Sequence, residues 1–292
     1  MLQTDLSKKT TTDDLVWING KTQLLSQASI SVEDRGFQFA DGVYEVIRIV
    51  NHKPFLLQDH LQRLADSCEA ISIFAAFDLD YLSQQICDFV RASSLPHAMV
   101  YLQITRGVAS RNHIYKPNLQ PTILFYIRKL PAPLVPGIAV GMRLLPVIDE
   151  RWKKCWIKSI ALLPNVLAKN QAVQAGFDEA IFIDNQIVTE GSATNIFAVI
   201  HGQLITHPVG EKVLPGITRA VLLQLCKKLN INVAERPFTE TEARAADELF
   251  ITSTTREISC ASHWKGEHRW HHPGPITMKL HQAIYELVCC DD

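Results

Sequence analysis

The stretch Lys129-Leu-Pro-Ala-Pro-Leu-Val-Pro136 divides the sequence into two halves. Proline has a fixed backbone torsion and no amide hydrogen, so a proline-rich stretch neither continues a helix nor joins a central strand. We therefore expect a linker at residues 131–136, between an α+β domain over residues 1–130 and a second domain over residues 137–292. The length of 292 residues also exceeds what one ordinary core needs, which favours two domains.

Upstream of the linker, the pattern predicts hairpins alternating with helices. Asn19-Gly20 is a hairpin turn dipeptide, and a second turn is expected at Asn51-His52-Lys53. The first dozen residues are polar, and residues 1–14 are expected to be a frayed tail. The expected strands are 16–18, 23–26, 42–50, 54–57, 99–106 and 122–127, and apolar spacing predicts helices around 61–71 and over 79–92.

Downstream of the linker, strands and helices mix. Gly176 is a plausible end for a helix over 166–175, and Thr239 with Glu242 forms a capping-box pattern for a short helix. Hairpins are expected around Asp184-Asn185 and His201-Gly202. The other expected elements are strands at 138–145, 180–183, 187–190 and 248–253 and helices at 218–229 and 276–288.

Composition excludes several classes of function. The net charge is −1, with 29 basic and 30 acidic residues, so no basic face for nucleic acid is implied. The seven cysteines are irregularly spaced and contain no Cys-x-x-Cys pair, so no disulfide framework or metal site is expected. No apolar run approaches the ~20 residues of a membrane span, and the polar N-terminus is unlike a secretory signal. A cytoplasmic protein without membrane or nucleic-acid partners is expected.

Two charged residues stand where burial would make them reactive. Lys158 lies in the apolar stretch Cys155–Leu163, and a lysine amine that loses its water becomes a nucleophile suited to Schiff-base formation. Glu190 ends an expected strand in TEGSATN, and a buried glutamate needs a cationic partner such as a protonated pyridine nitrogen. Taken alone, a lysine is more often a surface residue, and Glu190 fits a solvated hairpin end equally well.

Other residues could bind anions. Arg63 lies on the first expected helix, and a guanidinium suits a phosphate. The stretch Gly216-Ile217-Thr218 opens a helix, whose positive end attracts anions, and Thr252–Thr255 offers hydroxyls after a strand. Ser110-Arg111-Asn112-His113 lies on a loop that could bind a carboxylate. A solvated helix face, capping and turn chemistry explain the same residues without a ligand, and Tyr44 on its strand fits a core aromatic.

Together these residues fall within motifs of a known family. The chain resembles the fold-type IV pyridoxal-phosphate enzymes, and within them most closely the D-amino-acid (D-alanine) aminotransferases. One departure is Ala40, which stands where the family usually has glycine. The motifs that carry the resemblance are EDRGFQFADGVYEV (33–46), HLQRL (60–64), TRGVASRNH (105–113), IKSIALLPNVLAK (157–169), TEGSATNIF (189–197), LPGITR (214–219) and DELFITSTTREI (247–258).

The resemblance implies a two-domain α+β fold with pyridoxal 5'-phosphate between the domains. It implies that Lys158 forms the Schiff base and moves the proton at the substrate's Cα, and that Glu190 contacts the pyridine nitrogen. The second domain, 137–292, would be α/β-barrel-like and carry most of the cofactor site. The other implied contacts are Arg63, Ile217, Thr218 and Thr254 at the phosphate, Leu214 at the ring, and Tyr44, Arg111 and His113 at the substrate's α-carboxylate, the last set shared across a homodimer interface.

The activity implied is a ping-pong transfer of the amino group of a D-amino acid to a 2-oxo acid, with D-alanine and 2-oxoglutarate as the pair. Branched-chain L-aminotransferases, (R)-amine transaminases and aminodeoxychorismate lyases share the lysine and the glutamate, so they stay open as alternatives. Arg111 with His113 favours the D-amino-acid enzymes. A non-catalytic phosphate-binding module is the last alternative, and Lys158 and Glu190 argue against it, because neither is needed to hold a phosphate.

Overall fold

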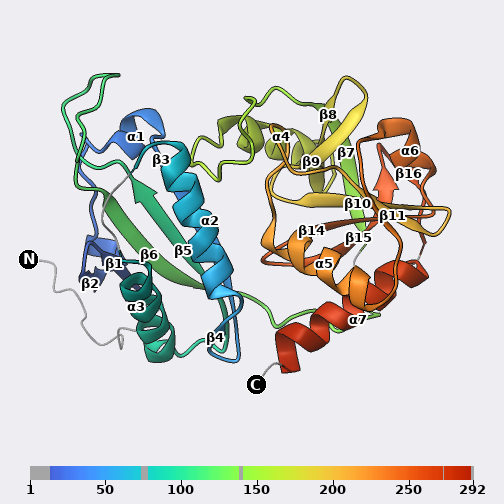
Figure 1. Cartoon of the computed structure of the whole chain (residues 1–292), viewed down its shortest axis with the longest axis horizontal. Coiled ribbons are helices and arrows are strands. Elements are labelled where there is room, and N and C mark those ends of the chain that lie inside the picture. Colours follow the sequence, from blue (N-terminus) through green and yellow to red (C-terminus); the bar gives the residue numbers. More distant parts are fainter. Residues whose placement is uncertain (1–13, 74–77, 138–140, 272, 291–292) are drawn as a thin grey trace, which may run out of the picture. The chain divides into compact units, whose positions relative to one another are not determined.

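The structure is a computed structural model that describes residues 14–73, 78–137, 141–271 and 273–290. The expected tail therefore falls, up to residue 13, outside the described residues, as does the start of the strand expected at 138–145. The chain divides into two compact units, Met1–Ala132 and Pro133–Asp292. Each unit has its own sheet and its own helices (Figure 1), which confirms the α+β fold class.

The first unit is an antiparallel sheet whose helices α2 and α3 lie along one face (Figure 1). Its strand order is β2-β1-β6-β5-β3-β4. The elements are β1 (Leu15–Ile18), β2 (Lys21–Leu24), a 3-10 turn (Leu25–Gln27), α1 (Arg35–Phe39), β3 (Gly42–Val50), β4 (Lys53–Pro54), α2 (Leu57–Ala70), α3 (Leu79–Ala92), β5 (His97–Thr105) and β6 (Thr122–Lys129).

The two hairpins of this unit form where turn residues permit a left-handed backbone. Asn19 and Gly20 adopt φ values of 46° and 87°, and Asn51 and His52 adopt 50° and 63°. Positive φ at both central residues gives the turn type that matches strand twist. The expected hairpins are confirmed, and the helix at 79–92 has the bounds expected from its spacing.

Strand β3 directs its residues alternately to the two faces of the sheet. Glu45, Ile47 and Ile49 are fully buried, and Glu45 contacts side chains of α2. Tyr44, the neighbouring residue, therefore points to the opposite face. The two candidate residues on this part of the chain, Tyr44 and Arg63 of α2, are thereby kept on different faces of the first sheet.

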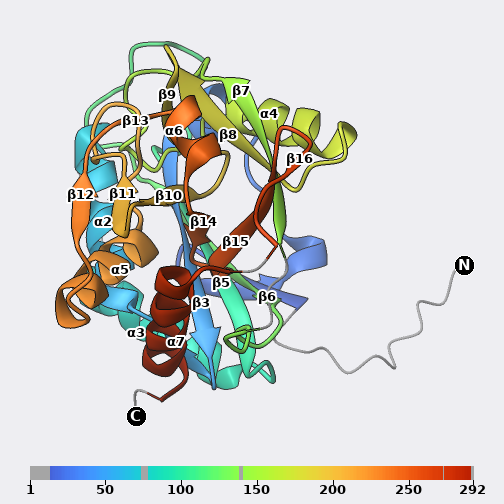
Figure 2. The ribbon, with the colours of Figure 1, turned by 90° about the vertical axis from the view of Figure 1, so that its right-hand side faces the viewer.

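The second unit is built on one mixed sheet of order β12-β11-β10-β14-β15-β7-β8-β9-β13, with β16 beside β15. Helices α5 and α7 pack against each other (Figure 2). The elements are β7 (Met142–Ile148), α4 (Leu163–Gln174), β8 (Glu179–Asp184), β9 (Ile187–Gly191), β10 (Asn195–Ile200), β11 (Gln203–Thr206), α5 (Ile217–Lys228), β12 (Val233–Glu235), β13 (Phe238–Thr239), α6 (Glu240–Ala245), β14 (Glu248–Ser253), β15 (Glu257–Trp264), β16 (Glu267–His268) and α7 (Pro275–Cys290).

Strand β7 runs parallel to both of its neighbours, β8 and β15, and this geometry positions the candidate site. The strand ends at Ile148, three residues later than the sequence pattern indicates. Residues that follow β7 therefore emerge at the carboxyl end of parallel strands, where ligand-binding side chains commonly gather. The capping box of α6 is present as expected. None of the described helices is long and apolar enough to cross a membrane.

Candidate active site

Glu190 is a buried carboxylate held by donors from three separate segments of the chain. It lies near the end of β9 and is 5% exposed. Its Oε1 accepts from Arg151 Nη1 at 2.5 Å, and its Oε2 accepts from the Leu214 amide at 2.9 Å and from Asn195 Nδ2 at 3.2 Å. The solvated hairpin end that the sequence equally allowed is therefore wrong, because Glu190 is enclosed in the second unit.

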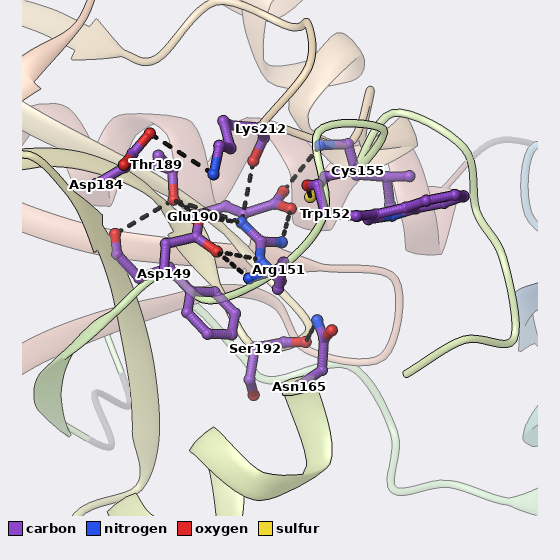
Figure 3. A network of polar contacts seen from close by, with 12 residues as sticks. Asp149, Arg151, Trp152, Cys155, Asn165, Asp184, Thr189, Glu190, Ser192 and Lys212 are labelled. Carbon is purple, nitrogen blue, oxygen red and sulfur yellow. Dashed lines mark hydrogen bonds and ion pairs between the residues drawn. The ribbon is translucent and has the colours of Figure 1, made fainter. Parts of the chain in front are cut away.

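Arg151 links Glu190 to a second buried carboxylate, Asp149 (Figure 3). Its Nε donates to Asp149 Oδ1 at 3.0 Å and its Nη2 to Oδ2 at 2.9 Å. Its guanidinium also lies 4.1 Å from the centre of the Phe182 ring. Sequence reasoning missed Arg151 and Asp149. The signal was present, since both follow β7 directly, but the strand was expected to end earlier.

The two carboxylates of this network, Asp149 and Glu190, differ in the direction of their pKa shifts. Burial opposes ionisation of Asp149, but the hydrogen bonds and the charge of Arg151 outweigh it and lower the pKa of Asp149. Burial raises the pKa of Glu190, the charge and hydrogen bond of Arg151 offset this only in part, and the charge of Asp149 adds to the rise. Glu190 is thus the less compensated of the two carboxylates and would gain most from a further cation.

Asn195 connects Glu190 to the start of α5. Its amide donates to Glu190 and, at 3.0 Å, to the Leu214 carbonyl. A Cβ on Gly216 would lie 2.0 Å from Asn195 Oδ1, so this position admits only glycine without a shift. Gly216 is the N-cap of α5 and carries no side chain to cap the helix. The first amides of α5, at Ile217 and Thr218, therefore suit an external anion.

Thr254 follows β14 at the turn that leads into β15, and it is half-buried. Strand β14 pairs with β10, with Asn195 opposite Thr252, and α5 packs against β14. The structure therefore gathers Glu190, Leu214 and the start of α5 around Asn195, beside the strand that leads to Thr254. Asn195 was quoted within a motif but was not singled out as a site residue.

Lys158 lies in the irregular segment between β7 and α4, in the same unit as Glu190. Its side chain is half-buried, unlike that of a fully solvated surface lysine. The segment is held by backbone hydrogen bonds, among them Cys155 N to Glu211 O at 2.8 Å and Ser159 N to Ile157 O at 2.8 Å. A half-buried amine on a fixed backbone is suited to act as a nucleophile.

Arg63 is buried in the first unit, so the solvated helix face that its sequence context favoured is wrong. Its Nε and Nη2 donate to Glu45 Oε1 and Oε2 at 2.7 and 2.8 Å, a bidentate pair. His60 Nδ1 lies 2.7 Å from Glu45 Oε2, so this histidine belongs to the same buried network. Burial opposes ionisation of Glu45, but Arg63 and His60 outweigh it and hold the pKa at about 2.

Arg111 and His113 lie together on the exposed loop after β5. The Arg111 guanidinium lies 4.5 Å from the centre of the Phe39 ring, and the His113 ring lies 5.5 Å from the same ring. Arg35 Nη1 donates to the Asn112 carbonyl at 2.6 Å and so fixes the backbone between them. Sequence reasoning missed Arg35 and Phe39, although both fall within the motif at residues 33–46.

Tyr44 is half-buried and belongs to a row of tyrosines across three strands of the first sheet. Its ring centroid lies 5.8 Å from that of Tyr101, which in turn lies 5.2 Å from that of Tyr126. Burial, with the neighbouring tyrosines, raises the pKa of Tyr101. The row offers phenolic hydroxyl groups, which can donate and accept hydrogen bonds to a polar ligand.

The residues described by the structure contain no group of three or more histidine, cysteine, aspartate or glutamate side chains arranged to hold a metal ion. The second unit instead contains the half-buried amine of Lys158, the under-compensated carboxylate of Glu190 and, linked to Glu190 through Asn195, the N-terminus of α5.

Comparison with known proteins identifies relatives of this chain. The family model for amino-transferase class IV matches residues 42–264. A D-alanine aminotransferase of Bacillus licheniformis is 38% identical over 274 residues, covering 94% of this chain and 96% of the relative. A D-alanine aminotransferase of Listeria monocytogenes (serotype 4b, strain F2365) is 39% identical over 280 residues, with 94% and 96% covered.

A solved structure agrees in fold over nearly the whole length. It is the branched-chain aminotransferase of the thermophilic archaeon Thermoproteus uzoniensis with norvaline, with a TM-score of 0.85 and 26% sequence identity, covering 94% of this chain and 94% of the other.

Proposed function

Because this chain belongs to the class IV aminotransferases, we propose that it moves the amino group of a D-amino acid, D-alanine first, to a 2-oxo acid such as 2-oxoglutarate. We propose pyridoxal 5'-phosphate as its cofactor. The observation that carries the proposal is the under-compensated carboxylate of Glu190, which lies beside the start of α5 through Asn195. The higher identity to curated D-alanine aminotransferases supports a D-amino acid over a branched-chain L-amino acid.

The residues fit the two ends of the proposed cofactor. Two carboxylates and one guanidinium leave one negative charge in the buried network of Asp149, Arg151 and Glu190, and a protonated pyridine nitrogen would balance it. A phosphate suits the amides and hydroxyl at the start of α5. The residues that would hold pyridoxal 5'-phosphate are Lys158, Glu190, Leu214, Ile217, Thr218, Thr254 and Arg63.

Each residue has a role in the proposed reaction. The cofactor, when bound, supplies an aldehyde that condenses with amines and a ring that accepts electrons. Lys158 would hold the cofactor covalently and then, as a free amine, move the proton released at the substrate's Cα. Glu190 would hold the proton on the ring nitrogen. Leu214, whose amide already fixes Glu190, would orient the ring.

The substrate's carboxylate would be bound by Arg111 and His113, with Tyr44 as a further donor. Arg111 and His113 are both exposed in a single chain, and a carboxylate is bound tightly only where water is excluded. We propose that a second copy of this chain covers them in a homodimer. This assignment makes Arg111 and His113 the residues that distinguish amino acids from amines that lack a carboxylate.

The experiment that tests the proposed reaction removes the amine of Lys158. We expect Lys158→Ala to lose pyruvate formation from D-alanine and 2-oxoglutarate by at least about 10³-fold, because the proposal assigns both the covalent and the proton-transfer step to Lys158. Lys153→Ala, a change at an exposed lysine of the same segment, serves as the matched control and should retain full activity. Retained turnover in Lys158→Ala would overturn the assignment.

A substrate comparison tests the stereochemistry. The wild-type protein is offered D-alanine, L-leucine and an (R)-amine that lacks a carboxylate, each with 2-oxoglutarate or pyruvate as acceptor. We expect D-alanine to be preferred over the amine, because Arg111 and His113 would bind a carboxylate, and over L-leucine, because the relatives of higher identity are D-alanine aminotransferases. A preference for L-leucine contradicts the D-amino-acid assignment, and a protein that stays colourless with added pyridoxal phosphate contradicts the enzyme assignment altogether.

A further inference from the structure

Arg151 is shared unequally between two carboxylates (Figure 3). Asp149 receives the fork of the guanidinium, Nε and Nη2, whereas Glu190 receives only Nη1. Bidentate pairing is the stronger arrangement, because two parallel hydrogen bonds fix distance and orientation together. The hydrogen bonds of Arg151 therefore stabilise Asp149 more than Glu190, in agreement with the lowered pKa of Asp149 and with the pKa of Glu190, which burial raises and Arg151 offsets only in part.

The guanidinium is prevented from turning its fork toward Glu190. Its Nη2 also donates to the Lys212 carbonyl at 3.0 Å and lies 3.4 Å from the Thr189 hydroxyl. That hydroxyl is 3.2 Å from Asp149 Oδ2, so Thr189 supports the same pair. The ring of Phe182 covers one face of the guanidinium. All three charged side chains are buried, so water does not substitute for these contacts.

We propose that Asp149 and Arg151 are positioning residues that set the basicity of Glu190, with Asp149 holding the fork of Arg151 so that Glu190 stays an incompletely compensated carboxylate. This inference rests on the proposed function, because the group that benefits is a protonated nitrogen beside Glu190. Asp149 contributes in two ways, by occupying the fork and by adding its own negative charge. Both effects favour a proton on a neighbouring ring nitrogen.

Removing the charge of Asp149 should weaken this effect. In Asp149→Asn the guanidinium faces one buried carboxylate instead of two, and Glu190 becomes the only charge it can balance. We expect the ring nitrogen of bound pyridoxal phosphate to be protonated less readily, with its titration midpoint lower by about one pH unit, a tenfold change in the protonation equilibrium. Arg151→Gln removes the cation instead, so it should raise the same midpoint.

The experiment uses pyridoxal phosphate labelled with ¹⁵N in the ring and the full chain. The ¹⁵N chemical shift of the bound cofactor is followed from pH 5 to pH 10, since it reports protonation of that nitrogen directly and does not depend on turnover. The dissociation constant of pyridoxal phosphate is measured alongside. Circular dichroism and thermal unfolding verify that each variant is folded before its shift is read.

Asp178→Asn is the matched control. Asp178 accepts the fork of Arg143 through Nε at 3.0 Å and Nη2 at 2.9 Å, the geometry of the Asp149–Arg151 pair, but at the protein surface. In Asp178→Asn, the ring nitrogen of bound pyridoxal phosphate should titrate with the same midpoint as in the wild type. If Asp149→Asn fails to fold, Arg151→Gln decides alone by the direction of its shift.

The outcomes separate the inference from the proposed function. A wild-type chain that binds no pyridoxal phosphate overturns the proposed function. A wild-type chain that binds it with a protonated nitrogen, together with an unchanged midpoint in Asp149→Asn, overturns only the role of Asp149. Asp149→Asn removes a negative charge and Arg151→Gln removes a positive one, so the inference requires opposite shifts of the midpoint. Shifts in the same direction overturn it.

Discussion

Glu45 anchors Arg63, the arginine proposed to bind the cofactor's phosphate. It is completely buried on β3, and its two oxygens accept from Arg63 and His60 of α2. A buried carboxylate is tolerated only when cations and donors replace the water it loses. The same contacts fix the guanidinium of Arg63. Glu45 therefore both ties α2 to the sheet and determines where Arg63 lies.

We expect Glu45→Gln to lower the free energy of unfolding at pH 7 by about 3–5 kcal/mol, because the charge of Arg63 loses its buried partner. Urea unfolding measures this. The pKa of Glu45 is lowered in the folded protein, from 4.5 to about 2, so its stabilisation is fully present above pH 4.5 and is lost as the pH falls through 2. The difference between the two proteins should shrink over that window.

Glu267→Gln is the control for this prediction. Glu267 pairs with Arg244 at the surface, where both side chains are about half exposed, and a surface pair contributes only ~0–1 kcal/mol. Equal unfolding free energies for the wild type and Glu45→Gln at pH 7 would refute the assignment of Glu45 as the residue that anchors α2.

Helix α1 is short, and it ends in a residue poorly suited to its backbone. Ala40 is the C-cap and has φ 53° and ψ 33°, the left-handed conformation. Glycine adopts this conformation without the steric cost that a Cβ imposes. The structure thus gives a physical reason why glycine would suit this position better than alanine. The same helix supplies Arg35 and Phe39, which hold the loop that bears Arg111 and His113.

Ala40→Gly should therefore stabilise the protein, by up to about 1 kcal/mol, because relief of the left-handed strain outweighs the added freedom of the unfolded chain. Thermal unfolding measures the change. Ala65→Gly, within the ordinary helix α2, is the matched substitution and should destabilise by about 1 kcal/mol. The idea fails if the two substitutions shift the stability in the same direction.

Elements with local signals could be predicted from the sequence, and those without such signals could not. The turn at Asn19-Gly20 and the capping box of Thr239 and Glu242 depend on adjacent residues, and both are present. Strand β15 and helix α1 were missed, since β15 forms by pairing with β14 and β7, far apart in sequence. Arg151 was missed because β7 was expected to end at residue 145 and ends at Ile148, and its pairing with Glu190, 39 residues away, leaves no local pattern.

At the scale of the whole molecule, α4 presents its larger apolar residues outward. Ala168 and Ala172 are the buried residues of this helix, whereas Leu163, Val166, Leu167 and Val173 are each at least half exposed. A helix usually buries its larger apolar residues against its own core. An outward apolar face of this kind indicates contact with another protein surface, and a second copy of the chain is the partner that the proposed carboxylate site also requires.

Sedimentation should accordingly show a dimer of twice 32.8 kDa. We expect Leu167→Glu to raise the dimer dissociation constant by about tenfold or more, because a charge buried in an apolar interface costs several kcal/mol, while the folded monomer is unaffected, since Leu167 is 61% exposed. Tyr81→Glu, at an exposed aromatic of α3 (51%), is the control and should leave the dimer intact. A monomeric wild type would remove the second copy from the proposed carboxylate site, whereas a dimer unaffected by Leu167→Glu would place the interface on a surface other than α4.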